Sequence, residues 1–341
     1  MHFSTLSFAY LVGVAYAQNS ICNTECQKGC DDACQAVIQE AYDAESKLWV
    51  NDIVSDPFHS TPSNISAASP GDVLRWENVP AEQLRSNWTI PAGLSLSRSI
   101  RLCSTTNNKG LYYDWKAPFI LAESGYAVVA PDYAGQGSDI PQGFMYESGF
   151  LHAADVAYSL IAAKKVLGNL SEKWAVYGHS EGGMTAWRTA ERLAIPGEER
   201  LHKAGKFIGA VAAAPALRPQ KLIPLSWAET GTGGGPFSVY FLQSLAGLFP
   251  DQIKVEDYLS DTALQRLDVL DNPCFQTGIA AVGQLTPETL FKNTSWLEHP
   301  DKGEQKFPIN RREFQPRLVS IIRDDHPRVF IAPVQDFLQL L

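Results

Sequence analysis

The chain has 341 residues, of which 45% are hydrophobic and 19% are charged, as is ordinary for a globular protein. The formal net charge is −9, and there is no basic run or patch, so nucleic acid is excluded as an expected partner. The length allows one large α/β domain with an insertion, or two small domains.

The first residues have the pattern of a secretion signal. Residues 6–14 form an apolar stretch too short to span a bilayer, and Ala15–Ala17 is an A-x-A cleavage site. We expect residues 1–17 to be a signal peptide and the mature protein to begin near Gln18, secreted and extracellular. Later runs fall short of 18 apolar residues, so the mature protein is expected to be soluble. The sequons of a glycosylated chain begin at Asn64, Asn87, Asn169 and Asn293.

Six cysteines are consistent with an oxidising compartment. Four of them recur every fourth residue, at Cys22, Cys26, Cys30 and Cys34. On one continuous helix, neighbours would lie about 5–6 Å apart at Cβ, too far for a relaxed disulfide. Their pairing therefore needs a second segment, a non-helical path or another chain. The C-x₂-C spacing of zinc knuckles is absent, so we expect no metal.

We divide the rest of the chain by its pattern of apolar residues. Residues 18–72 are a Cys-rich segment with a helix over 33–50 and a Pro/Ser/Asn-rich linker at its end. Residues 73–215 alternate between helix and strand, which predicts an α/β core with a parallel sheet. The expected core elements are a helix over 111–123 ended by Gly125, a buried strand over 126–130, a helix over 150–167, a strand over 174–177, a helix over 184–193 and a strand over 207–214.

The stretch 173–188 combines a strand, a tight turn and a helix around Ser180. This context is typical of the nucleophile elbow of α/β-hydrolases, in which a strained turn exposes the serine Oγ at the end of the sheet. Gly178 and Gly182 flank the serine because those positions have little room for a side chain. The N-terminus of the following helix points at the same place, so the N–H of Glu181 is the expected oxyanion donor.

Residues 216–310 have a different pattern. Helical stretches over 239–249 and 255–270 follow a glycine-rich segment, 231–235, and no convincing strand occurs. A mainly helical insertion after a sheet strand indicates a cap or lid, although a packing subdomain without a gating role is equally open. Residues 311–341 hold a last core strand over 328–332 and a truncated C-terminus.

Three segments together resemble one known family. Residues 107–115, 125–139 and 178–187 are similar to the fungal secretory lipases of the Candida-type lipase A group, and the resemblance covers roughly residues 102–332. It implies an α/β-hydrolase fold, ester hydrolysis by a Ser-Asp-His triad, an ester or lipid substrate, and no metal or cofactor. It also implies a disulfide between core and cap, at Cys103 and Cys274. The cap is the expected place for any contact with a lipid interface.

The chain departs from that family in two places. The strands and His-Gly-type oxyanion turn that the family carries before Arg101 are missing. The missing block would have about 40–60 residues, which is longer than an ordinary strand and loop. Asp336 falls near the position of the triad acid, one residue short in spacing, and no histidine follows it. We therefore expect a sheet that is incomplete at both ends, in an incomplete or alternatively spliced form of the enzyme.

Other histidines are weak substitutes for the missing base. His179 is adjacent to the serine but is expected to point away from it, and His152 and His299 are expected at the surface. His326 precedes the last strand, opposite the elbow, and is the first candidate to test. Two alternatives to a lipase or esterase stay open: an inactive α/β-hydrolase with a binding role, and an esterase that deacylates a small secondary metabolite. The sequence does not indicate the oligomeric state.

Overall fold

The computed structural model describes residues 20–49, 67–75, 108, 117–136, 143–271, 274–297 and 328–332. In this part of the chain, three strands form one parallel sheet in the order β1 (Lys173–His179), β2 (Lys206–Ala213), β3 (Arg328–Ala332). All three strands were predicted from their apolar runs. None of the described helices is long and apolar enough to cross a membrane.

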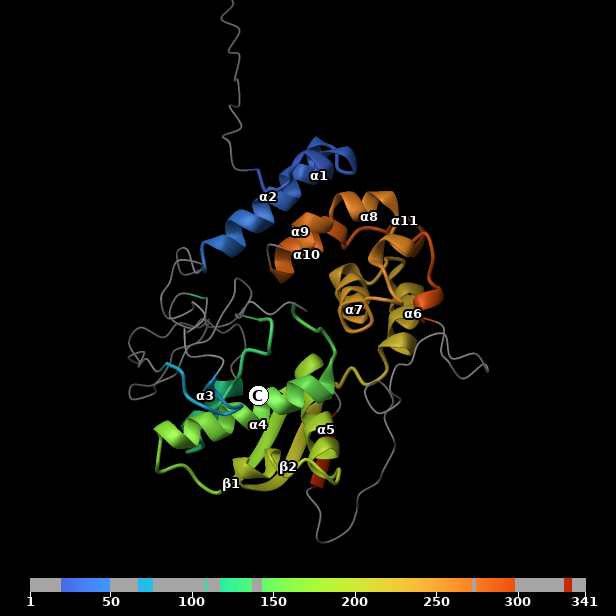
Figure 1. Ribbon diagram of the computed structural model, residues 1–341. Helices are drawn as coiled ribbons and strands as arrows, with labels where there is room; N and C mark the ends of the chain where they lie inside the picture. The colour runs from blue at the N-terminus through green and yellow to red at the C-terminus, as the bar shows by residue number, and fades with distance from the viewer. Residues whose placement is uncertain are drawn as a thin grey trace, which may run out of the picture.

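Two helices cover one face of this sheet, as Figure 1 shows. They are α4 (Gly149–Val166) and α5 (Glu181–Leu193), both close to their predicted bounds. Their small side chains pack on β1 and β2 together with the two indoles of Trp174 and Trp187 and the short helix η4 (Leu201–Ala204). Because α5 connects the neighbouring parallel strands β1 and β2, it is the crossover of a βαβ unit. This unit positions the elbow.

The predicted strand over 126–130 is absent. Helix α3 (Ala117–Glu123) ends as expected at Gly125, whose φ is +87°, and the N–H groups of Gly125 and Tyr126 close a Schellman motif on Ala122 and Leu121. The following residues belong to no strand, and Tyr126 is 67% exposed. An apolar run becomes a strand only when a neighbour pairs with it, and the described strands offer it no partner.

The insertion after β2 is helical, as predicted. It contains α6 (Pro219–Thr230), α7 (Gly235–Leu248), η5 (Val255–Asp257), α8 (Asp261–Gln265), α9 (Leu267–Asp271), α10 (Phe275–Val282), α11 (Pro287–Leu290) and η6 (Ser295–Leu297). The helical stretch predicted over 255–270 is present but is divided into the three short helices η5, α8 and α9. Leu259 forms a bridge with Phe291, and Ser260 then starts α8 by accepting a hydrogen bond from the N–H of Ala263.

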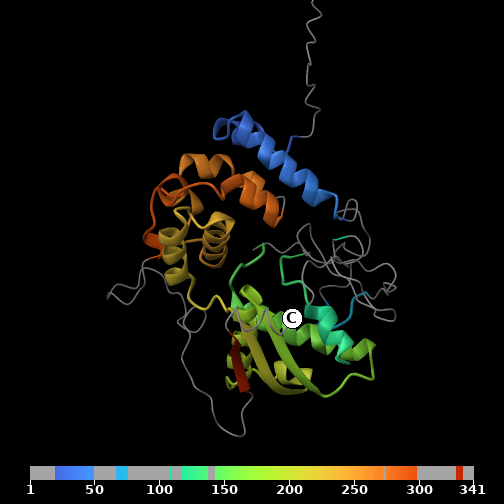
Figure 2. The same cartoon turned by 180° about the vertical axis from the view of Figure 1, so that it is seen from behind.

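The N-terminal segment packs on this insertion. Helices α1 (Thr24–Lys28) and α2 (Asp32–Ser46) lie beside α8, α9 and α10 in both views (Figures 1 and 2). The helix predicted over 33–50 is therefore confirmed, although it ends earlier. Polar contacts join the two parts: the guanidinium of Arg266 donates to the carbonyls of Gly29 and Ala281, and Asn23 donates to Asp268. We call α1, α2 and the insertion together the helical layer.

The four regularly spaced cysteines do not lie on one helix. Cys22 pairs with Cys26 and Cys30 with Cys34, with Cα atoms 5.2 and 5.4 Å apart. In each pair the first cysteine precedes an extended N-cap residue, Asn23 or Asp31, and the second lies in the first turn of the helix. The non-helical path is thus the alternative that the structure realises. The two capping residues were the sequence signal for it.

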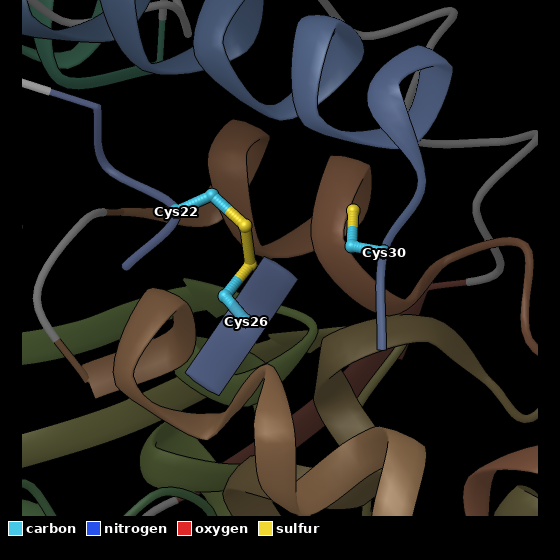
Figure 3. Close-up of side chains that lie close together, drawn as sticks. All are labelled: Cys22, Cys26 and Cys30. Atoms are coloured by element: carbon cyan, nitrogen blue, oxygen red, sulfur yellow. A yellow bond between two sulfur atoms is a disulfide. The ribbon is translucent and has the colours of Figure 1, made fainter. Parts of the chain in front are cut away.

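Three of these sulfur atoms lie close together. The Sγ atoms of Cys22, Cys26 and Cys30 are all within 4.8 Å of one another, in the interior between α1, α2 and the rest of the helical layer (Figure 3). Because all three belong to disulfides, they offer no thiolate to a metal ion.

Candidate active site

Ser180 occupies a strained turn between β1 and α5. Its φ is +56° and its ψ is −117°, outside the regions that non-glycine residues ordinarily adopt. Its N–H donates to the carbonyl of Ala213 on β2 at 3.0 Å, and its carbonyl accepts from the N–H of Met184 at 3.0 Å. The turn is therefore held from the sheet on one side and from the helix on the other, and the side chain of Ser180 is exposed.

The glycines around Ser180 have different roles. A Cβ on Gly178 would collide with the backbone carbonyl of Gly182, and one on Gly183 would lie 2.5 Å from the carbonyl oxygen of Ala213. A Cβ on Gly182 would meet nothing within 4 Å. The expectation that Gly182 lacks room for a side chain is therefore wrong, since its own carbonyl fills the space next to Gly178. Gly183 is the second position where close backbone approach requires glycine.

The helix after Ser180 presents free backbone N–H groups. Glu181 is the first of the 13 residues of α5, and the first N–H groups of any α-helix have no partner inside it. Together with the helix dipole, they favour negative charge near the exposed serine. This arrangement can stabilise an oxyanion.

The side chain of Glu181 turns toward the loop before α4. Its Oε1 accepts a hydrogen bond of 3.1 Å from the N–H of Glu147. Burial raises the pKa of Glu181 to about 8. Burial and then the neighbouring charge of Glu181 raise the pKa of Glu147 well above its ordinary value. The two carboxyl groups therefore hold protons at neutral pH more strongly than exposed glutamates do.

Glu147 is an unusual residue in its own right. It has a φ of +63°, its side chain is 4% exposed, and its carboxylate oxygens accept no hydrogen bond within the described residues. The neighbouring side chain of Tyr146, and then the guanidinium of Arg188, lower its pKa but do not outweigh burial. Sequence reasoning missed Glu147, because a single glutamate between aromatic residues has no recognisable spacing.

His152 is buried, so the prediction of a surface position is wrong. It lies on the inward face of α4, its ring stacks on Tyr133 at 3.9 Å, and burial lowers its pKa to about 3. Its Nε2 lies 3.0 Å from the carbonyl of Met145, and its Nδ1 lies 3.4 Å from the hydroxyl of Thr185. Nε2 must therefore carry the ring proton and donate it to the carbonyl of Met145. Nδ1 then accepts a hydrogen bond from the hydroxyl of Thr185. With both nitrogens engaged, His152 is poorly placed to act as a base.

Some of the remaining predicted residues lie in the described part of the chain, and the others lie outside it. His179 alternates along β1 with the buried residues Trp174 and Val176, so it lies on the sheet face away from α5. Asn169 and Asn293 are exposed, as glycosylation would require, and Cys274 is disulfide-bonded. The predicted residues outside the described part are Gln18, Asn64, Asn87, Cys103, His299, His326 and Asp336.

One surface depression lies elsewhere. It is formed by residues 67, 68 and 72–74 with Lys165 and Val166, at the C-terminal end of α4. The elbow contacts the other end of α4, where Gly149 approaches Met184. Sixteen helical residues separate these ends, or about 24 Å. The depression is therefore unrelated to Ser180.

Comparisons with known proteins agree with this geometry. Residues 106–339 match the model of the family described as "Alpha/beta hydrolase family". Among solved structures, Candida antarctica lipase A in its closed state is 18% identical with a TM-score of 0.51, covering 83% of this chain and 74% of that chain. A second structure of the same lipase is 18% identical with a TM-score of 0.49, covering 73% and 66%. No curated protein sequence matches.

The family match covers more than half of the chain, and the solved structure shares its fold. The expected α/β-hydrolase fold with a helical insertion is thus confirmed. The chain belongs to the α/β-hydrolase family.

Proposed function

We propose that the protein is a serine carboxylic ester hydrolase, a lipase or esterase, in which Ser180 is the nucleophile. The observation that carries the proposal is the left-handed, exposed Ser180 between β1 and α5. A serine in this conformation is costly to maintain and is held by hydrogen bonds on both sides. Family membership adds independent support.

The chemistry follows from the elbow. The Oγ of Ser180 would attack the ester carbonyl carbon and lose its proton to a base, forming a tetrahedral oxyanion held by the N–H of Glu181. Collapse of this intermediate would expel the alcohol, which takes up a proton, and leave an acyl-serine. Water would then cleave the acyl-serine and release the carboxylic acid. No metal or cofactor is needed for these steps.

The base and the acid are open assignments. Because both nitrogens of His152 are engaged, we assign His326 as the first base to test and Asp336 as the acid. The same observation favours the second candidate function, an inactive homologue that binds ligands or partners without turnover. Removing the base of a triad lowers kcat by several orders of magnitude.

One experiment separates the two functions. The 341-residue chain and its Ser180→Ala variant would be treated with a fluorophosphonate probe and with a short p-nitrophenyl ester. We expect covalent labelling that disappears in Ser180→Ala, with turnover at least about 10³-fold below ordinary enzymes if no base is present. Labelling that persists in Ser180→Ala would contradict the nucleophile assignment. Complete lack of labelling and turnover in the parent would favour the inactive homologue.

For substrate, we propose an ester presented at or near a lipid surface, with contact through the helical layer. Phe237 on α7 and Phe275 on α10 lie 5.1 Å apart between ring centres and are 43% and 42% exposed. Exposed adjacent apolar rings favour contact with an apolar partner. Higher activity on an emulsified triglyceride than on a soluble ester of the same acyl length would support this. The reverse preference would favour a small secondary metabolite.

We also propose that the protein is secreted and glycosylated. The disulfides Cys22–Cys26 and Cys30–Cys34 and the bonded Cys274 support an oxidising compartment, and Asn169 and Asn293 are accessible. N-terminal sequencing of secreted protein should begin near Gln18, and an intact Met1 on a cytosolic protein would contradict the proposal.

A further inference from the structure

Three consecutive residues connect the helical layer to the elbow. The carbonyl of Met145 accepts a hydrogen bond from His152. The ring of Tyr146 lies 6.1 Å from that of Phe237 and 6.2 Å from that of Tyr240, both on α7. The N–H of Glu147 holds the carboxyl of Glu181 at 3.1 Å. We call the three-stranded sheet with α4, α5 and η4 the sheet layer. Neighbouring residues of one short segment thus contact the sheet layer, the helical layer and the elbow.

Residues 145–147 have little freedom to move independently of one another. Met145 and Glu147 are buried, and the carbonyl of each accepts a backbone hydrogen bond, from Ser148 and Gly149 respectively. The positive φ of Glu147 is unfavourable for a non-glycine residue and persists only where the surroundings fix it. A displacement of the Tyr146 ring by α7 would therefore also displace the N–H of the next residue.

We propose that Tyr146 and Glu147 are positioning residues that couple the placement of the helical layer to the oxyanion donor at Glu181. The inference rests on the proposed function, in which the N–H of Glu181 stabilises the oxyanion. With Tyr146 packed on α7, the N–H of Glu147 fixes the Glu181 side chain and so the first turn of α5. When α7 shifts away from Tyr146, that support is lost and the donor is less well placed.

Substitutions at both ends of this path test the coupling. Tyr146→Ala removes the ring and Tyr146→Phe keeps it. Glu181→Ala removes the acceptor for Glu147, whereas Glu181→Gln keeps an oxygen there, and both retain the backbone N–H of residue 181. The matched control is Tyr42→Ala on α2, because Tyr42 is also a half-buried tyrosine of the helical layer but its ring packs on that of Trp49, at 5.6 Å.

The first measurement is the rate of fluorophosphonate labelling of Ser180. Removing a whole oxyanion donor lowers rates by about 10²–10³-fold, so a misplaced donor should lower labelling by roughly 10-fold in Tyr146→Ala and in Glu181→Ala. Tyr146→Phe and Glu181→Gln should recover most of the rate that the alanine variants lose, and Tyr42→Ala should stay within about 3-fold of the parent. Because both sites lie on one path, the double variant Tyr146→Ala/Glu181→Ala should be about as slow as the slower single variant. Multiplied effects, or a Tyr146→Ala rate equal to that of Tyr42→Ala, would overturn the proposal.

The second measurement does not depend on catalysis. Amide hydrogen exchange in the peptide 179–187 should be faster in Tyr146→Ala and Glu181→Ala than in the parent or in Tyr42→Ala. Unchanged exchange in Tyr146→Ala would overturn the coupling even if labelling fell. If Ser180 in the parent does not react at all, the proposed function fails, while the exchange experiment still decides the coupling.

Discussion

The two layers of this protein have different kinds of core. In the helical layer, large side chains fill the interior, among them Phe241, Leu242, Ile253 and Trp296. In the sheet layer, most of the buried residues are alanines, with only a few large side chains such as Trp174 and Trp187. Burial of large apolar side chains stabilises through the area removed from water. Alanine contributes less area but lets α5 approach the strands closely.

Both layers depend on contacts between residues far apart in sequence, but the kinds of contact differ. In the helical layer, Arg266 donates to the carbonyl of Gly29, 237 positions earlier. The four-residue disulfides at the starts of α1 and α2 add local constraints. In the sheet layer, β2 pairs with β3, which lies more than 100 residues later. We conclude that the helical layer is joined by side-chain contacts, whereas the sheet layer depends on strand pairing and close backbone approach.

The largest effect should come from filling the space beside Gly178. In Gly178→Ala, the new Cβ collides with the carbonyl of Gly182, and neither backbone can move without breaking the elbow. We expect a loss of more than about 4 kcal/mol in the free energy of unfolding, or no folded protein. Urea denaturation followed by circular dichroism would measure it.

Gly182→Ala is the matched control. The open space at Gly182 and its place in the first turn of α5 predict a change within about 1 kcal/mol. Equal losses in the two variants would mean that helix geometry, not close approach, limits this turn.

The elbow was predictable because its constraints are local. The spacing of Gly178, Ser180 and Gly182 and the apolar runs on either side are sufficient to place a strand, a turn and a helix. The strand predicted over 126–130 failed because strand formation needs a partner that the run itself does not encode. The pairing of the cysteines stayed open for a related reason, since their four-residue period hides two helix starts at Asn23 and Asp31.

The surroundings of Ser180 were less predictable. Glu147 reaches Glu181 from 34 positions earlier, and only the packing of α4 on α5 brings them together. His152 was expected at the surface, but its neighbours on α4 did not reveal which face Tyr133 would cover. Contacts of this kind depend on tertiary structure, which residue type and spacing do not specify.

A pH series should separate the carboxyl groups behind the elbow from the rest of the sheet layer. Because the folded state raises the pKa of Glu181 from 4.5 to about 8, folding takes up a proton between these values. The stabilisation by this proton is complete below about pH 4.5 and is lost as pH rises through about 8. The slope is at most about 1.4 kcal/mol per pH unit for one group.

Between pH 5 and pH 8, the substitution Glu181→Gln should reduce this loss in the free energy of unfolding by about 2–3 kcal/mol. The substitution Glu123→Gln, at an exposed position, should not. His152 has the opposite sign, because its pKa falls from 6.5 to about 3 and its contribution is lost as pH falls below 6.5. Thermal unfolding at a series of pH values measures both the loss of stability with rising pH and the loss with falling pH. If stability falls with rising pH as much in Glu181→Gln as in the parent, the Glu181 carboxyl is ionised throughout.

The smallest effect concerns the contact that joins α2 to the rest of the helical layer. Glu45 lies in the last turn of α2, where the helix dipole disfavours a carboxylate. It is buried because it caps α10 instead, accepting from the N–H groups of Cys274 and Gln276 and the hydroxyl of Thr277 at 2.7–3.0 Å. Hydrogen bonds to a charged group contribute about 1.5–3 kcal/mol.

Glu45→Ala should therefore lower the free energy of unfolding by about 2 kcal/mol, and Glu45→Gln by less, because one oxygen can still accept. Glu40→Ala, at an exposed position on the same helix, is the control for the change in helix propensity and should change stability by no more than about 0.5 kcal/mol. Urea denaturation compares the three. If Glu45→Ala matches Glu40→Ala, the N-terminal helices are held by apolar contacts and by the hydrogen bonds of Arg266 and Asn23, and the comparison between the layers rests on packing rather than on polar caps.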